Sequence, residues 1–188
     1  MEFLKPITDR IPDYAKDIRL NLGSVLGRSS LDAEAALGVA LAAAYAAKCQ
    51  ALVEAIRGSG QISAQEATGA LSAAALMAMN TVWYPYLDMA GDDDLKTQRA
   101  ELRMNVYGTH GGVDRQRFEL YSLAASIVGK CRYCVRSHYD LLKESGMTAL
   151  QLRDAGRIAA VVAAAAAVLS VEDQGANDET ATPAARAS

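Results

Sequence analysis

The sequence predicts an all-α fold of about eight helices, supported by its composition, the spacing of its apolar residues and its helix-capping residues. Alanine, the best helix former, dominates the 51% of the chain that is apolar, whereas aromatic residues contribute only 6%. Apolar residues recur at helical spacing, and no alternating apolar and polar pattern is long enough for a strand. A chain of 188 residues can bury one substantial core, so we expect a single helical domain over residues 1–170.

Four helices are expected in the first half of the chain, at residues 12–23, 31–47, 49–57 and 64–79. Ser30 can cap the second of them, which is apolar on most faces and is therefore expected to be buried. Gly58 marks the expected end of the third helix. Ser63 and Glu66 form a capping box, in which each side chain accepts a hydrogen bond from the backbone N–H of the other residue. The fourth helix is therefore expected to begin at residue 64.

Four further helices are expected at residues 102–107, 115–128, 131–145 and 149–169, with loops at 91–94 and 110–112. Asp114 can cap the helix that ends at residue 128, and Gly129 is expected to follow it as the C′ residue. Thr148 and Gln151 form a second capping box, which opens the last helix. Residues 171–188 are polar and rich in small residues, so we expect a disordered tail there.

The chain also resembles itself, which predicts an internal duplication of a helical unit. Residues 38–53 align with residues 120–135, including a shared Lys-Cys pair, and the two capping boxes correspond after a small change in loop length. We expect a degenerate repeat at about 31–80 and an active repeat at about 114–170, because only the second contains polar residues at several matched positions. In the first repeat, these positions hold Leu37, Leu52 and Ile56 in place of Glu119, Cys134 and His138.

Charge and hydropathy exclude several classes of protein. The net charge is −3 and no basic surface is evident, so we expect no nucleic acid as a partner. The longest uncharged apolar run, residues 158–169, is shorter than the roughly 20 residues that a membrane helix needs, so we expect no membrane contact. The N-terminus lacks the apolar core of a signal peptide, and three cysteines are an odd number for a disulfide framework. We therefore expect a cytoplasmic protein.

The residues most capable of chemistry lie in one short segment that contains Cys131, Cys134 and His138. A thiol must lose its proton to act as a nucleophile, and the N-terminus of a helix favours the thiolate. His138 follows Cys134 by one helical turn and can accept its proton. Cationic side chains surround the pair, namely Lys130, Arg132 and Arg136. The helix terminus favours a thiolate at Cys131 and the histidine favours one at Cys134, so this reasoning leaves open which cysteine attacks.

Glu119 is a candidate helper, because the chain reverses after Gly129 and can bring this carboxylate back towards the cysteines. Two other interpretations of the pair remain open: half of a zinc site, completed by distant ligands such as Cys49 and His110, or inert core cysteines. Taken alone, Cys49 is typical of a core residue and His110 of an exposed loop. The remaining noticeable side chains are interpreted as packing residues, namely Met77, Met79, Trp83 and Tyr84.

The arrangement Glu119, eleven residues, Cys131-x-x-Cys134, three residues, His138 resembles the signature of the AhpD-type alkylhydroperoxidases. These proteins belong to the carboxymuconolactone decarboxylase-like superfamily. The likeness extends to other segments and covers about residues 1–170. The segments that carry it are residues 11–22, 77–80 and 102–105.

The resemblance implies an AhpD-like all-helical fold, a homotrimer, and a peroxidase for antioxidant defence that binds no flavin, haem or metal. Its substrates would be organic hydroperoxides, with hydrogen peroxide as a further substrate. Cys134 would be the peroxidatic thiol and Cys131 the resolving thiol, and the two would form a redox-active disulfide. His138 and Glu119 would form the proton relay. The reductant would be the lipoyl group of a carrier protein of the 2-oxoacid dehydrogenase type, or a peroxiredoxin would serve as the redox partner.

One residue departs from the family pattern, because characterised relatives can have a histidine where this chain has Tyr133. A phenol is a poor base at neutral pH, so we leave Tyr133 out of the proton relay. The main alternative function is a general thiol–disulfide oxidoreductase that does not use peroxide and does not need Glu119. A decarboxylase or lactone-processing enzyme would have no use for the cysteine pair, and a non-enzymatic redox sensor has no visible DNA-reading element.

Overall fold

The computed structural model describes the backbone of residues 1–180 and the side chains of residues 1–174. Within this part of the chain all regular elements are helical, which confirms the predicted all-α class. The elements, in chain order, are the 3₁₀ helix Glu2–Leu4, α1 (Lys5–Thr8), the 3₁₀ helix Asp13–Ala15, α2 (Lys16–Gly27), α3 (Ala33–Ala46), α4 (Gln50–Arg57), α5 (Ala64–Ala90), α6 (Asp93–Thr97), α7 (Val106–Thr109), the 3₁₀ helix His110–Gly112, α8 (Arg115–Val128), α9 (Arg132–Glu144) and α10 (Ala149–Thr180).

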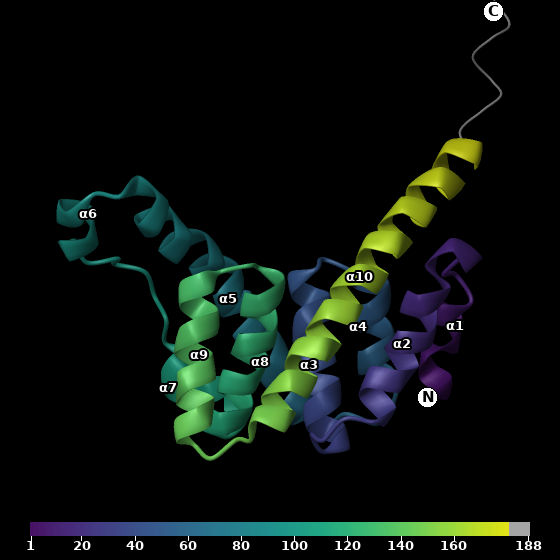
Figure 1. Cartoon of the computed structure of the whole chain (residues 1–188), viewed down its shortest axis with the longest axis horizontal. Coiled ribbons are helices and arrows are strands. Elements are labelled where there is room, and N and C mark those ends of the chain that lie inside the picture. Colours follow the sequence, from purple (N-terminus) through teal and green to yellow (C-terminus); the bar gives the residue numbers. More distant parts are fainter. Residues whose placement is uncertain (181–188) are drawn as a thin grey trace, which may run out of the picture.

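Helices α3, α5, α8 and α10 form the packed centre of the molecule, and the other long helices cover it. Helix α9 lies against α8 and α5, α4 lies against α3, and α2 lies against α10 (Figure 1). The last turns of α5 and the short α6 project from the body at the end opposite the N-terminal helices (Figure 1). The shared surface of α5, α8 and α9 is where the predicted site residues meet.

Three helix starts agree with the predicted caps, because short polar side chains bind free backbone N–H groups there. The predicted cap Ser30 is wrong: Asp32 caps α3 by accepting from the N–H of Ala35 at 2.9 Å, and Ser30 donates to Asp154. The Asp114 carboxylate accepts a hydrogen bond from the N–H of Arg117 at 2.9 Å, and Thr148 and Gln151 make both bonds of a capping box. The Ser63 hydroxyl caps α5 as predicted, but the Glu66 side chain does not complete the box. It accepts a hydrogen bond from the Tyr121 hydroxyl instead.

Several predicted helix boundaries in the middle of the chain are wrong. Helix α5 does not stop near residue 79 but continues to Ala90, and Gly91 then ends it in a left-handed conformation. The loop expected at 91–94 includes the start of α6, because the Asp92 carboxylate caps it. In place of a helix at 102–107 the structure has α7, and a 3₁₀ helix occupies the expected loop at 110–112.

The expected disordered tail is wrong for residues 171–180, because α10 continues to Thr180. Two contacts with the N-terminal segment hold this extension: Arg10 pairs with Asp173, and the Tyr14 hydroxyl donates a hydrogen bond to Glu172 at 2.7 Å. Residues 181–188 of the predicted tail lie outside the described part of the chain. Residues 149–174 are also apolar and long enough to cross a membrane, but the buried side chains of α10 pack against α2, α3 and α8, which accounts for their hydropathy.

Gly38 in α3 allows α3 and α8 to approach, because a Cβ at this position would overlap the ring of the buried Tyr121. We expect Gly38→Ala to lower the free energy of unfolding by about 2 kcal/mol, since overpacking a core has this typical cost. Gly23→Ala in α2 is the matched control: its Cβ would meet no atom within 4 Å, and alanine should stabilise the helix by roughly 0.5–1 kcal/mol. Urea unfolding of both variants measures this, and equal stabilities would contradict the packing role of Gly38.

Candidate active site

The backbone around Cys131 joins the end of α8 to the start of α9. Lys130 adopts a left-handed conformation (φ 55°), and the N–H of Cys131 donates to the carbonyl of Ser126 at 3.2 Å, which closes the end of α8. The Cys131 sulfur then accepts a hydrogen bond from the N–H of Cys134 at 3.2 Å and caps α9. One residue therefore ends one helix and starts the next, and this fixes the position of its sulfur.

Gly129, predicted to be the left-handed C′ residue, instead has an ordinary helical φ of −71°. The glycine is needed for a different reason: a Cβ there would lie 2.7 Å from the side-chain methyl of Thr81. It allows α5 to pass close to the turn between α8 and α9. Asn80 of α5 thereby comes beside the cysteines.

Cys131 and Cys134 form a disulfide, with their Cα atoms 5.3 Å apart. Both residues are buried, and Cys134 is only 2% exposed. The Cys134 sulfur lies 3.7 Å from the backbone oxygen of Asn80, so the pair lies at the junction of α5, α8 and α9. The pair is close enough for a dithiol and disulfide cycle without a large backbone movement.

Glu119 and His138 form a buried pair next to the disulfide. The His138 Nδ1 atom lies 2.6 Å from Oε2 of Glu119, and both side chains are almost fully buried. Arg115, which is exposed, is the nearest cation to the carboxylate, at 4.0 Å from Oε1. When Nδ1–H donates to the carboxylate, Nε2 is the ring nitrogen left to take or return a proton. The structure therefore pairs Glu119 with His138 and Cys131 with Cys134, and α9 places His138 one helical turn after Cys134.

Met77 covers the other ring nitrogen of His138. Its sulfur lies 3.2 Å from Nε2, and its side chain also lines a cavity of about 680 Å³ between α3, α4 and α5. Met77, which the sequence pattern identified only as a packing residue, therefore belongs to the surroundings of the site. The Met77 side chain lies between this cavity and the imidazole of His138.

Tyr133, between the two cysteines, stacks on Tyr84 of α5 with ring centroids 4.6 Å apart. The two rings line a groove of about 610 Å³ between α9 and the projecting end of α5. Burial raises the pKa of Tyr84, with a further contribution from Tyr133, so this phenol stays neutral. The groove also holds four cations, namely Lys96, Lys130, Arg132 and Arg136.

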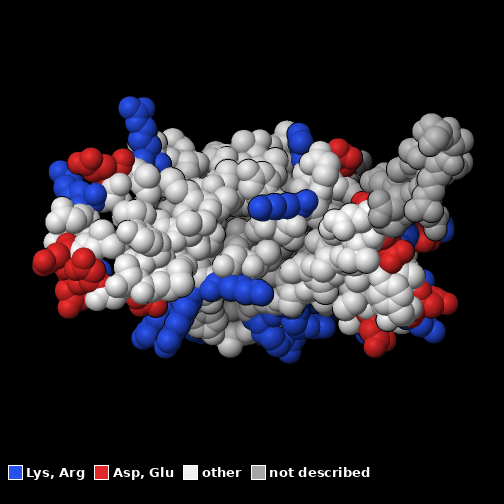
Figure 2. Space-filling model, turned by 90° about the horizontal axis from the view of Figure 1, so that it is seen from above, with Lys and Arg blue, Asp and Glu red and all other residues white. Residues whose placement is uncertain are grey.

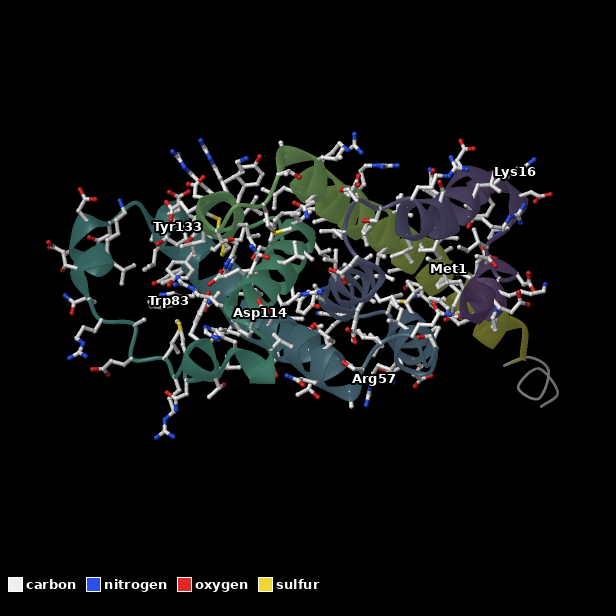
Figure 3. All side chains as sticks on the ribbon, turned by 90° about the horizontal axis from the view of Figure 1, so that it is seen from below. Met1, Lys16, Arg57, Trp83, Asp114 and Tyr133 are labelled. Atoms are coloured by element: carbon white, nitrogen blue, oxygen red, sulfur yellow. A yellow bond between two sulfur atoms is a disulfide. The ribbon has the colours of Figure 1, made fainter. Side chains whose placement is uncertain are left out.

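The basic groove is part of an uneven distribution of charge over the surface. Seen from above, Lys and Arg side chains gather along the long edge on the α9 side, whereas acidic residues lie mainly towards the two ends (Figure 2). Tyr133 and Trp83 lie at the same end of the molecule, remote from Lys16 (Figure 3). The basic groove is therefore a local feature of the site and not a property of the whole surface.

The other candidate residues lie away from the cysteine pair. Cys49 is a buried free thiol that lines the cavity beside Met77, in agreement with a core residue. His110 is half-buried, with its ring 5.8 Å from that of Phe118, and is not the exposed loop residue that was expected. Among residues 1–174, no three His, Cys, Asp or Glu side chains converge in a group that could hold a metal ion.

Sequence reasoning missed the contribution of α5 to the site, which consists of Asn80, Met77 and Tyr84. The only available signal was the family-like segment at residues 77–80, which contains a polar Asn in an otherwise apolar stretch. Contacts between helices so far apart in sequence can be identified only from the three-dimensional structure.

Comparison with known proteins places the chain among close relatives. The model of the carboxymuconolactone decarboxylase family matches residues 93–173. A protein of Rhodospirillum centenum named alkyl hydroperoxide reductase AhpD is 44% identical over 90% of this chain and 91% of its own length. Proteins of the same name from Rhizorhabdus wittichii and Streptomyces avermitilis are 41% and 42% identical, over 88% and 86% of this chain and over 96% and 92% of their own lengths.

We expect His138→Asn to slow the alkylation of Cys134 by iodoacetamide about tenfold at pH 7, because the thiol loses its proton acceptor. Asparagine keeps a donor for the buried Glu119. The measurement uses the dithiothreitol-reduced protein and mass spectrometry of the peptide that contains Cys134. His110→Asn alters the only other histidine and serves as the control. Equal alkylation rates for the two variants would show that His138 does not act on the thiol.

Proposed function

Because the chain belongs to the AhpD-type alkylhydroperoxidases of the carboxymuconolactone decarboxylase-like superfamily, we propose that it is a thiol peroxidase that reduces organic hydroperoxides to alcohols. The observation that carries the proposal is the buried pair of Glu119 and His138 beside the Cys131–Cys134 disulfide. A peroxidase needs a proton carrier at its thiol, because the thiol must lose a proton and the departing alkoxide must gain one.

In the first step of the proposed cycle, Cys134 transfers its proton to His138 and attacks the distal oxygen of the hydroperoxide. The O–O bond breaks, an S–O bond forms, and His138 returns the proton to the departing oxygen. The products are an alcohol and the sulfenic acid of Cys134. Glu119 keeps His138 oriented and stabilises its charged form while it holds the proton.

In the second step, the Cys131 thiol attacks the sulfenic acid, and the disulfide forms with release of water. The pairing of the two sulfurs and the position of Cys131 at the start of α9 support this role. A dithiol then reduces the disulfide by exchange, and we propose the dihydrolipoyl group of a carrier protein as this reductant. The cycle consumes one hydroperoxide and one dithiol and needs no bound cofactor.

The groove beside Tyr133 supports a negatively charged carrier as the redox partner. Among residues 1–174, Asp88 is the one acidic residue that lines it, although Lys96 also pairs with Asp93 at 2.8 Å and Arg136 lies 3.8 Å from Asp140. An acidic protein surface would be attracted to such a groove, and the attraction would mainly increase the rate of association. The groove lies next to the turn that contains Cys131, the N-cap residue of α9.

We also propose a homotrimer, as the family resemblance implies. The projecting end of α5 exposes apolar side chains outside the basic groove that a monomer would leave in water, namely Val82 and Tyr86. Light scattering of the purified protein measures its molar mass, and a monomer mass would overturn this part of the proposal.

A general thiol–disulfide oxidoreductase is the second candidate, and the buried disulfide with its capped helix favours it. Such a protein would exchange disulfides through Cys131 and Cys134 and would not need Glu119. A peroxidase therefore needs the Glu119 carboxylate, whereas a general oxidoreductase does not.

A coupled assay with lipoamide, dihydrolipoamide dehydrogenase and NADH tests the proposed function. We expect NADH consumption that depends on cumene hydroperoxide and disappears in Cys134→Ser, because this variant lacks the attacking sulfur. Background consumption by a wild-type protein that still cycles between dithiol and disulfide would favour the second candidate.

Glu119→Gln distinguishes the two half-reactions when each is measured separately on the purified protein. We expect peroxide oxidation of the reduced protein to slow by roughly a hundredfold, the usual contribution of general acid–base catalysis. Reduction of the disulfide by dihydrolipoamide should stay unchanged. An unchanged peroxide rate would remove the observation on which the proposal rests.

Reversing the charge of Lys130, Arg132 and Arg136 to Glu tests the proposed carrier surface. We expect reduction by an acidic lipoylated carrier domain to slow about tenfold at low salt, and the difference to shrink as salt is added. The rate of peroxide attack should not change. Lys16→Glu, at the opposite end of the molecule (Figure 3), is the matched control. If both half-reactions fell equally, the groove would not be a carrier surface.

A further inference from the structure

Asn80 of α5 has a buried side-chain oxygen with no hydrogen-bond partner, and its backbone lies beside the sulfur of Cys134. It is only 2% exposed, its Oδ1 atom has no hydrogen bond, and its own backbone oxygen is 3.7 Å from the sulfur of Cys134. Buried polar groups are nearly always paired inside a folded protein. An unpaired amide oxygen in a residue whose backbone contacts the nucleophile therefore points to a ligand.

Two further unpaired hydroxyl groups belong to the same part of the structure. Ser122 and Ser126 of α8 are fully buried, and neither hydroxyl has a partner. They follow Glu119 by three and seven residues, so these three side chains share one face of the helix. We call the buried set formed by Asn80, Glu119, Ser122, Ser126 and His138 the polar seam.

The two helical units provide an internal comparison, because the residues matched to the polar seam in the other unit are apolar. At the offset that aligns Cys49 with Cys131, the four seam residues of α8 and α9 match apolar, buried residues of the first unit. At the slightly larger offset that aligns Ser63 with Thr148, Asn80 matches an apolar, buried residue of the second unit. These counterparts are Leu37, Ala40, Ala44, Ile56 and Ala165. The same helix packing is therefore possible without buried polar groups, so packing does not explain the seam.

We propose, on the premise of the peroxidase function above, that the side-chain amide of Asn80 binds the two oxygens of the hydroperoxide. An amide offers one acceptor and two N–H donors, and a hydroperoxide offers one O–H donor and two acceptor oxygens. The carbonyl of Asn80 accepts the O–H of the distal oxygen, and its N–H donates to the oxygen that carries the alkyl group.

This assignment gives Asn80 a specific part in the attack. As the Cys134 thiolate forms its bond to the distal oxygen, the O–O bonding pair moves to the alkyl-bearing oxygen. The N–H of Asn80 stabilises the negative charge there until His138 delivers its proton and the alcohol leaves. A fixed donor aimed at developing charge in a buried site is an effective form of transition-state stabilisation.

Asn80→Leu tests the assignment, because leucine has a similar size and no hydrogen-bonding group. Stopped-flow measurement on the reduced protein gives the rates of oxidation by cumene hydroperoxide and by diamide, which oxidises thiols without forming an alkoxide. We expect the hydroperoxide rate to fall roughly tenfold to a hundredfold and the diamide rate to change by less than about twofold. Thr81→Val, a polar-to-apolar change at the next residue, is the matched control; the Thr81 hydroxyl bonds the Met77 carbonyl and does not belong to the seam.

Peracetic acid provides a second readout, because its leaving group is a stable carboxylate that needs little help from a donor. The loss in Asn80→Leu should be smaller for this oxidant than for cumene hydroperoxide. Equal losses with all oxidants would assign Asn80 a structural role and overturn the inference, as would an unchanged hydroperoxide rate. If Asn80→Leu does not fold, Asn80→Ala replaces it with the same expectations.

The same data separate this inference from the proposed function. A wild-type protein that reacts with cumene hydroperoxide no faster than Cys134→Ser would overturn both. A wild-type protein that reacts rapidly, together with an equally rapid Asn80→Leu variant, would overturn the role of Asn80 alone.

Discussion

A carboxylate and an imidazole can be buried together only when each satisfies the other, and this constraint organises the site. Glu119 comes from α8 and His138 from α9, so their 2.6 Å contact holds the two helices in a fixed relation. Removing one partner of such a pair typically costs about 3–5 kcal/mol, since the other is left buried and unpaired. The turn between the helices contains Cys131, and the position of the sulfurs therefore depends on the same contact.

The helix starts and the chemical motif were predictable because both are local. Asp114 caps α8 through the backbone three residues ahead, and Cys131, Cys134 and His138 share one face of a single helix. Helix ends were harder to predict. Helix α5 passes residue 79 and continues through Pro85, and α10 continues to Thr180 through contacts with the distant N-terminal segment.

The contribution of α5 to the site could not be predicted, because it depends on how closely three helices approach. Gly129 was expected to serve the backbone conformation, but its lack of a side chain instead makes room for Thr81. The contact of Met77 with His138 and the stacking of Tyr84 on Tyr133 also join residues remote in sequence. A pattern in one segment contains no information about such pairs.

The capping role of the Cys131 sulfur has a consequence for the energetics of the disulfide. The N–H of Cys134 and the N-terminus of α9 point towards this sulfur, and both interact more strongly with a negatively charged thiolate than with a neutral disulfide sulfur. The fold thus stabilises the reduced form relative to the oxidised one. Such a bias raises the reduction potential of the pair, so that electrons flow towards it from a dithiol of lower potential.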